Sequence, residues 1–156
     1  MSTNNTASNK IVIVPEQGEP VTAQYNPKEV GIDKSVPWQK AKNSHANTPD
    51  LEFTSADGRS LSFELFFDGY EQNLDVHATY VSKLLKMAEV MDENGSEEKK
   101  RPPQVKVTWG TLPEFKGVVE SVSTKYTMFN AAGMPVRCTC SVKFKEANRL
   151  SFKKGQ

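Results

Sequence analysis

The sequence has few of the residues on which catalysis and metal binding usually depend. Its 156 residues include only two cysteines and two histidines. Neither His45 nor His77 has a cysteine, serine or carboxylate at a diagnostic spacing. No glycine-rich phosphate-binding loop is present either. The sequence therefore gives no support for a nucleophilic triad, a metal centre or a nucleotide site, and no cofactor is expected.

A strong charge of one sign and long apolar runs are also missing. The 20 basic and 19 acidic residues leave a formal net charge of +1, which argues against nucleic acid as a partner. No run approaches the roughly 20 apolar residues of a spanning helix, so no membrane insertion by this domain is expected. The polar start, MSTNNTASNK, lacks the apolar segment of a signal peptide. We therefore expect a cytoplasmic protein unless a larger machine carries it out.

The two cysteines, Cys138 and Cys140, are separated by one residue. On an extended strand they point to the same face with Cα atoms about 7 Å apart, at the outer limit for a disulfide. No further ligands lie near them in the sequence to complete a zinc site. We expect reduced, buried thiols that act as small apolar side chains.

Length and composition favour one folded domain. Apolar residues make up 37% of the chain and charged residues 25%, as in ordinary globular proteins. A chain of this length buries about two-thirds of its unfolded surface. We expect a flexible N-terminal arm over residues 1–9, a folded domain over residues 10–150 and a basic C-terminal tail over residues 151–156.

Most of the predicted elements are β-strands. Apolar and polar residues alternate over three stretches, 61–67, 105–109 and 136–145. The last of these alternates without fault. It follows a long β-prone run and a turn at residues 130–133, so the antiparallel pair of 117–129 with 134–145 should be the backbone of the sheet.

The N-terminal third is predicted to contain a hairpin and a long extended segment. Two β-prone stretches, 11–15 and 20–25, flank a four-residue connection. Residues 26–50 contain three prolines and few periodic apolar residues, so this segment should be extended rather than helical. A further strand is expected at 51–53, before a turn at 56–59.

One amphipathic helix is predicted after the central strand. Asp75 is a suitable N-cap, and apolar residues then recur at helical spacing at Val81, Leu84, Leu85, Ala88 and Met91. This pattern indicates roughly four to five turns lying on a sheet, followed by a charged loop at 92–101. The order of elements predicts a mainly β (α+β) fold, an antiparallel β-sandwich or barrel with one packed amphipathic α-helix.

A series of short motifs runs through almost the whole chain beyond the first ten residues. They are YNPKE (25–29), IDKSVPW (32–38), LSFELFFD (61–68), RPP (101–103), VTWG (107–110), FKGVVES (115–121), YTMF (126–129), GMPVRC (133–138) and VKFKE (142–146). No single motif is specific, but their order is. The chain resembles the tube-domain family of contractile injection systems.

This resemblance implies a fold of tail-tube type over residues 10–150 and a structural, non-enzymatic role. It implies a hexameric ring of the inner tube at the baseplate end, which joins the spike hub to the tube. The partners would be other copies of the chain, the hub, the tube protein, and baseplate wedge or sheath proteins. Family members typically carry a LysM-like module after this domain, and the sequence stops soon after VKFKE. The particle would assemble in the bacterial cytoplasm and leave on firing or release.

Two sets of candidate site residues follow, and neither is catalytic, cofactor-binding or metal-binding. The subunit-interface candidates are Tyr25, Pro37, Trp38, Arg101, Phe129 and Met134. The candidates for a strand face that lines the lumen or meets a neighbour are Arg137, Thr139, Ser141 and Lys143.

Other functions stay open at this point. The chain could be the bulk inner-tube protein, repeated along the tube. It could instead be a monomeric ligand-binding β-barrel that stacks a ligand on Trp38 and Trp109, although we expect Trp109 to pack in the core. A peptidoglycan hydrolase is the least favoured hypothesis, because no activated nucleophile or metal-ligand set is found.

Overall fold

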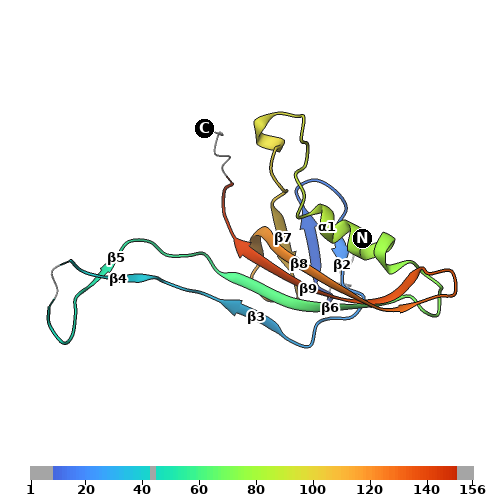
Figure 1. Ribbon diagram of the computed structural model, residues 1–156, viewed down its shortest axis with the longest axis horizontal. Helices are drawn as coiled ribbons and strands as arrows, with labels where there is room; N and C mark the ends of the chain where they lie inside the picture. The colour runs from blue at the N-terminus through green and yellow to red at the C-terminus, as the bar shows by residue number, and fades with distance from the viewer. Residues whose placement is uncertain (1–8, 43–44, 151–156) are drawn as a thin grey trace.

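The computed structural model describes residues 9–42 and 45–150, and its main feature is one antiparallel sheet (Figure 1). This sheet has seven strands in the order β2-β1-β7-β8-β9-β6-β3, and β4 and β5 form a separate two-stranded sheet. The strands are β1 (Val12–Pro15), β2 (Val21–Thr22), β3 (Val30–Asp33), β4 (Trp38–Lys40), β5 (Leu51–Phe53), β6 (Ser60–Asp68), β7 (Val105–Thr108), β8 (Phe115–Phe129) and β9 (Pro135–Glu146). The predicted C-terminal tail and all but the last residue of the predicted N-terminal arm lie outside the described residues.

Strand β9 lies at the centre of the main sheet. It pairs with β8 from Gly117 opposite Glu146 to Phe129 opposite Pro135, as predicted, and with β6 along its other side. Its alternate side chains are buried, namely Val136, Cys138, Cys140, Val142 and Phe144. Both cysteines are free and buried, which confirms that prediction. The regular alternation of β9 therefore reflects one face packed on the core and one face turned outward.

The predicted hairpin near the start of the chain and the predicted turn at 130–133 are present, whereas residues 56–59 form no turn. Strands β1 and β2 pair in an antiparallel register around a connection of five residues, 16–20, one more than predicted. The turn between β8 and β9 is held by Asn130, whose side-chain oxygen accepts from the main-chain N–H groups of Ala132 and Met134. Gly133 has a φ of +83°, a conformation that glycine adopts without steric cost.

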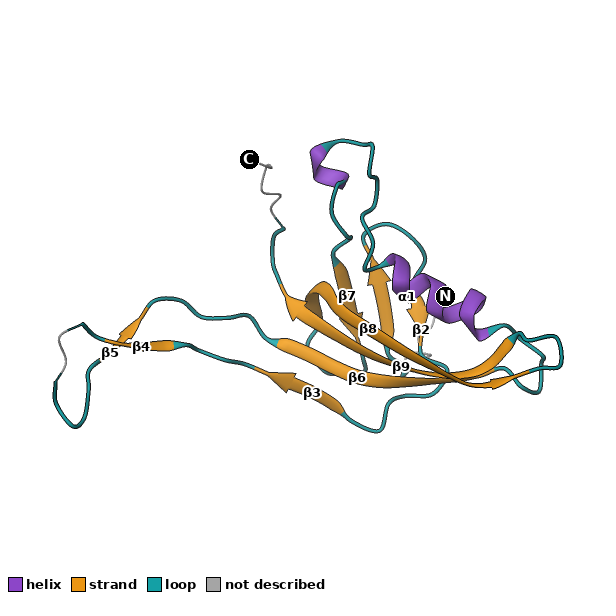
Figure 2. Cartoon of the chain, in the orientation of Figure 1, coloured by secondary structure: helices purple, strands orange, loops and turns teal. Residues whose placement is uncertain are grey.

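The helix lies on the concave face of the sheet (Figure 2) and is shorter than predicted. A π-helical turn, η2 (His77–Val81), is followed by α1 (Ser82–Lys86), each of five residues. The predicted cap is confirmed, because Asp75 Oδ1 accepts from the main-chain N–H groups of His77 and Ala78 at 2.9 and 3.2 Å. A 3₁₀ turn, η3 (Glu97–Lys99), lies in the charged loop that follows.

The face that the helix buries also differs from the prediction. Its buried apolar residues are Val76, Val81, Leu84 and Met87, whereas Leu85 and Ala88 are exposed and Met91 is half-buried. Val81 and Leu84 are buried as predicted, and the π turn that ends at Val81 places Val76, five residues before Val81, on the same face. The helix also ends early, at Met87, whose N–H donates to the carbonyl of Leu84 in a tighter turn.

The segment over residues 26–50 is extended in its described part, as predicted. Strand β3 pairs with β6 at one edge of the main sheet, and β4 pairs with β5. We call residues 34–42 and 45–59 the projecting ribbon, because they extend away from the body of the molecule (Figure 1). The predicted strand at 51–53 is present as β5, on this ribbon and away from the core.

One side chain fastens the two ends of the curled sheet. Gln24, just after β2, donates from Nε2 to the main-chain oxygen of Asp68 at 2.9 Å and accepts from its N–H at 2.8 Å. Strand β2 is one edge of the sheet, and β6 is next to the other edge. The mainly β fold with one packed helix is confirmed. Over the described residues, the sheet curls around its core without a ladder that closes it into a barrel.

Replacing Gln24 tests this fastening. Q24A should lower the free energy of unfolding by about 1 to 2 kcal/mol, because two main-chain groups of Asp68 lose their partners. Q24E should cost at least as much, since a carboxylate cannot donate to the Asp68 carbonyl. Urea unfolding followed by circular dichroism measures both changes. T22A changes an exposed side chain in β2, two residues before Gln24, and should have a much smaller effect. Equal losses of stability in T22A and Q24A would contradict the role of the Gln24 amide.

Candidate assembly surfaces

The outward face of β9 is a continuous polar surface. Arg137, Thr139, Ser141 and Lys143 alternate along it and are half-buried or exposed, so the structure places all four predicted residues on one face. Neighbouring strands extend this surface with small hydroxyl groups: Ser141 lies between Glu64 of β6 and Ser123 of β8, and Lys143 lies between Ser62 and Ser121. We call this surface the hydroxyl face.

The serines of β8 were missed by sequence reasoning. Register shifts interrupt the β8–β9 ladder, the first of them between Val119 and Ser121. Before it, the odd-numbered residues of β8 are buried; beyond it, Ser121 and Ser123 are exposed. A bulge of this kind moves all later side chains to the opposite face, and the long β-prone run contained no local signal for it.

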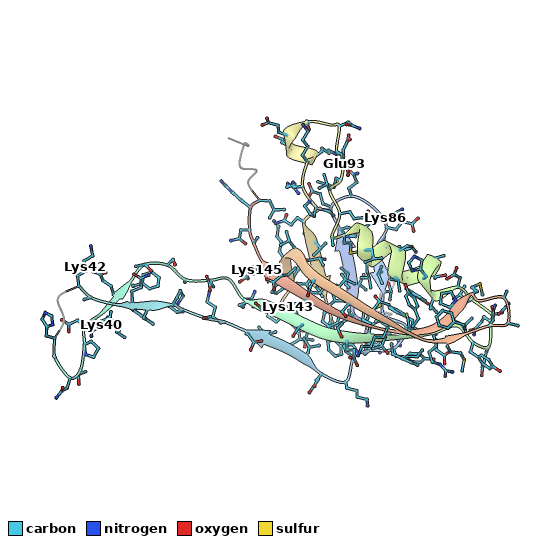
Figure 3. All side chains as sticks on the ribbon, viewed as in Figure 1. Lys40, Lys42, Lys86, Glu93, Lys143 and Lys145 are labelled. Atoms are coloured by element: carbon cyan, nitrogen blue, oxygen red, sulfur yellow. The ribbon has the colours of Figure 1, made fainter. Side chains whose placement is uncertain are left out.

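Opposite charges neutralise one another on and beside the hydroxyl face. Lys143 Nζ lies 3.3 Å from Glu120 Oε1, and Arg137 Nη2 lies 3.3 Å from Asp68 Oδ2. The pKa of Asp68 is lowered, first by the main-chain N–H of Tyr70 and then by Arg137. Figure 3 shows Lys143 and Lys145 extending from β9, far from Lys40 and Lys42 on the projecting ribbon. The face is therefore polar but carries little net charge.

A groove of about 1010 Å³ lies beside this face. One wall is the segment from Tyr25 to Gly31, and the other is the outward surface of β6, β8 and β9. Tyr25 is exposed and packs on Phe66, with ring centroids 5.9 Å apart. Phe66 interrupts the polar face of β6 in the sequence, and its partial cover by Tyr25 explains that interruption.

The projecting ribbon carries large apolar side chains that are more than half exposed among the described residues. Trp38 is 54% exposed, Leu51 60% and Phe53 58%. Trp38 and Phe53 pack edge to face with centroids 5.4 Å apart, and Pro37 is exposed beside them. A two-stranded ribbon has no core of its own, so these contacts alone do not hide the rings from water. The prediction that Trp38 lies outside the domain core is confirmed.

An ion pair fastens the root of the ribbon to the body. The guanidinium of Arg59 donates to Glu146 Oε2 from Nη2 at 2.6 Å and from Nε at 3.1 Å. The main-chain N–H of Arg59 donates to Oε1 of the same carboxylate at 2.9 Å. These bonds from Arg59 lower the pKa of Glu146 to about 2. The two residues are 87 positions apart, so no local pattern could have indicated the contact.

The remaining interface candidates lie in separate places. Arg101 is half-buried and donates to both carboxylate oxygens of Glu16, which ties the end of the charged loop to the β1–β2 turn. Phe129 and Met134 flank the turn between β8 and β9, where Phe129 is exposed. The six predicted interface residues thus do not form one site.

Trp109 and His77, which were considered above as candidate functional residues, have structural contacts. Trp109 is half-buried against the core, and its Nε1 donates to the main-chain oxygen of Asn9 at 3.1 Å. His77 Nδ1 is hydrogen-bonded to the hydroxyl of Tyr126. Among the residues described, no cluster of three or more His, Cys, Asp or Glu is placed to hold a metal ion. No helix in the same residues is long and apolar enough to cross a membrane.

Comparison with known families agrees with the order of motifs in the sequence. The model of the contractile injection system tube protein family matches residues 5–154. The chain belongs to this family. It is thus a tube protein of a contractile injection system, and the resemblance inferred from its motifs is confirmed.

Solved structures of phage-tail-like particles contain chains with some similarity to this tube protein. One is in the tail of an empty gene transfer agent particle with C6 symmetry, at 13% identity and a TM-score of 0.45. Another is in the virion of the native gene transfer agent particle, at 13% identity and a TM-score of 0.39. Each match covers 97% of this chain and 100% of the other chain. A search of curated proteins found no match.

The ribbon root should make stability depend on acid pH. The folded pKa of Glu146, about 2, lies below its ordinary value of 4.5, so protonation favours the unfolded state. The contribution should be complete above about pH 5 and lost as the pH falls towards 2. E146Q should therefore be less stable than the wild type at pH 6, and the difference should shrink at pH 3. Urea unfolding at both pH values measures this; a difference that does not change with pH would contradict it.

Proposed function

We propose that this tube protein forms a hexameric ring of the inner tube at the baseplate end, where it joins the spike hub to the tube. The observation that carries this proposal is the projecting ribbon, where Trp38, Leu51 and Phe53 are each more than half exposed. A tube protein is surrounded by further copies, and a neighbour can bury this apolar surface. The ribbon is the natural element for reaching an adjacent subunit or the next ring.

Ring formation is also supported by the edges of the sheet. Within the described residues strand β3 pairs with β6 alone, so one side of Val30–Asp33 has no strand partner there. Exposed edges of this kind favour association with another chain. In a closed ring each subunit meets the next through two different surfaces, so every edge finds a partner and assembly stops at a fixed number of subunits.

The hydroxyl face is the surface we assign to the lumen. A wall that lets cargo pass must be polar without binding strongly, and short hydroxyl side chains meet this need. Here Ser121, Ser123 and Ser141 lie beside Lys143, which is paired with Glu120. A face lined by unpaired charges of one sign would hold cargo of the opposite sign.

The proposed role is structural, and no reaction is assigned to the chain. One side of the ring would dock on the hub and the other would serve as the template for the first ring of bulk tube protein. Baseplate wedge or sheath proteins would be further contacts. The ring would assemble in the bacterial cytoplasm and move outward with tube and spike when the sheath contracts. It must therefore hold together under load, through many contacts rather than one.

The number of copies per particle tests the position in the tube. An adaptor at the baseplate end should be present as one ring, whereas the bulk tube protein should be present in many. Quantitative mass spectrometry of purified particles, with the spike protein as internal standard, measures the ratio. Many copies per spike would overturn the baseplate position and favour the bulk tube protein.

Removing the aromatic pair of the ribbon should block assembly without unfolding the subunit. W38S/F53S should abolish rings and stacks in negative-stain images of concentrated protein. The thermal transition of the body should stay unchanged, because both side chains are exposed. V90S removes an exposed apolar side chain away from the ribbon and serves as the control. Assembly that survives W38S/F53S would contradict the role of the ribbon.

Cysteine labelling should distinguish a lumen wall from a subunit contact. S141C and T139C in assembled tubes should react with a small maleimide but only slowly with a large polyethylene-glycol maleimide. E89C, exposed on the opposite side of the body, should react with both, while the native cysteines are buried. Protection of S141C and T139C from both reagents would place this face against a neighbour and contradict the assignment to the lumen.

A further inference from the structure

The ladder between β6 and β9 ends at the root of the projecting ribbon. Its last pair is Ser60 with Lys145, and the N–H of Glu146 then donates to the carbonyl of Arg59 at 2.8 Å. The N–H of Arg59 in turn donates to Oε1 of the Glu146 side chain rather than to a main-chain carbonyl. The carboxylate therefore occupies the position where a main-chain carbonyl would continue the ladder.

The two strands come closest at Gly58, just before they part. A Cβ on Gly58 would lie 2.9 Å from the carbonyl oxygen of Glu146 and 3.1 Å from its Cβ. The absence of a side chain at this position lets the two strands come close and then diverge. The ribbon leaves the body at this point, held by the side chain of Glu146 rather than by further strand pairing.

The returning strand of the ribbon is bound to this carboxylate, and the outgoing strand is tied to the returning one. On the returning strand, Arg59 binds the carboxylate through three donors. On the outgoing strand, the ammonium of Lys34 also lowers the pKa of Glu146, although less than Arg59 does. The N–H of Asp57 donates to the carbonyl of Ser35 at 3.2 Å, which ties the two strands to each other. The direction of one strand is thus coupled to that of the other.

The guanidinium is itself held in place. Arg59 lies over the ring of Phe115, with its central carbon 5.8 Å from the ring centroid. Phe115 is buried and packs against Phe144, two residues before Glu146 in β9. Two donors on one planar group also fix the angle between guanidinium and carboxylate, which a single ammonium does not.

We infer that Glu146 is a positioning residue that sets the direction in which the projecting ribbon leaves the body, and that ring assembly depends on this direction. The second half of this inference rests on the proposed function, in which the ribbon reaches a neighbouring subunit. We call the contacts of Arg59 with Glu146, together with the close approach of the two strands at Gly58, the joint of the ribbon. A ribbon released at this joint keeps its aromatic pair but presents it to the neighbour over a wide range of angles.

Hydrogen exchange and imaging of the same variants test both halves. In full-length E146Q at low concentration, the amides of Asp57 and Arg59 should exchange about tenfold faster than in the wild type, because a charge-assisted contact is lost. Amides at the centre of β9 should speed up by no more than the loss of global stability that urea unfolding gives for E146Q, so the excess at residues 57 and 59 reports the joint. At high concentration, E146Q should form several-fold fewer rings in negative-stain images. R59K should behave like E146Q, since a lysine keeps the charge but not the fork.

E19Q is the matched control, because it removes a carboxylate that pairs with Lys83 away from the ribbon. It should change neither the exchange at residues 57 and 59 nor the number of rings. Unchanged exchange of the Asp57 and Arg59 amides in E146Q would contradict the role of Glu146 at the joint. Faster exchange with normal ring numbers would overturn the link to assembly. If the wild type forms no rings even with hub and tube partners, the proposed function fails, and exchange in E146Q alone decides the role of Glu146 at the joint.

Discussion

Burial of one face of β9 is the interaction on which the rest of the fold depends. Cys138, Cys140 and Phe144 have no exposed surface, and β9 has β8 on one side and β6 on the other. Each buried side chain of this size contributes about 1.5 to 3 kcal/mol, and their spacing sets the register of both neighbouring strands. The helix then covers the same side, where Phe67 and Tyr80 stack with centroids 4.1 Å apart.

The sequence was sufficient to predict those elements whose structure depends mainly on residues close to them in the chain. The alternation of β9 and β6 predicted both strands and their faces, and Asp75 predicted the start of the helix. The helical face was predicted too long because α1 ends at Lys86, before Ala88 and Met91, and the apolar pattern does not mark that end. The bulge in β8 hid Ser121 and Ser123, because one extra residue reverses every side chain beyond it.

Contacts between distant segments were beyond the reach of patterns. Leu51 and Phe53 carry a clear strand signal, but nothing local indicates that their partner is β4 on a ribbon rather than the core. The pairing of Arg59 with Glu146 and that of Gln24 with Asp68 join residues far apart in the chain. The family could still be inferred, because the order of its motifs does not require these contacts to be known.

In the proposed function the subunit is pushed outward with its tube, and the fastening by Gln24 then has a mechanical consequence. A ladder such as β8–β9 shares a load among many bonds in parallel, so it yields only when all of them do. The fastening by Gln24, which we call the seam of the sheet, consists of two hydrogen bonds from one flexible side chain to the main chain of Asp68. Under strain this seam should open first, and the sheet should then flatten or curl more tightly while its long ladders stay intact. Each subunit can thereby change its curvature reversibly without losing its fold.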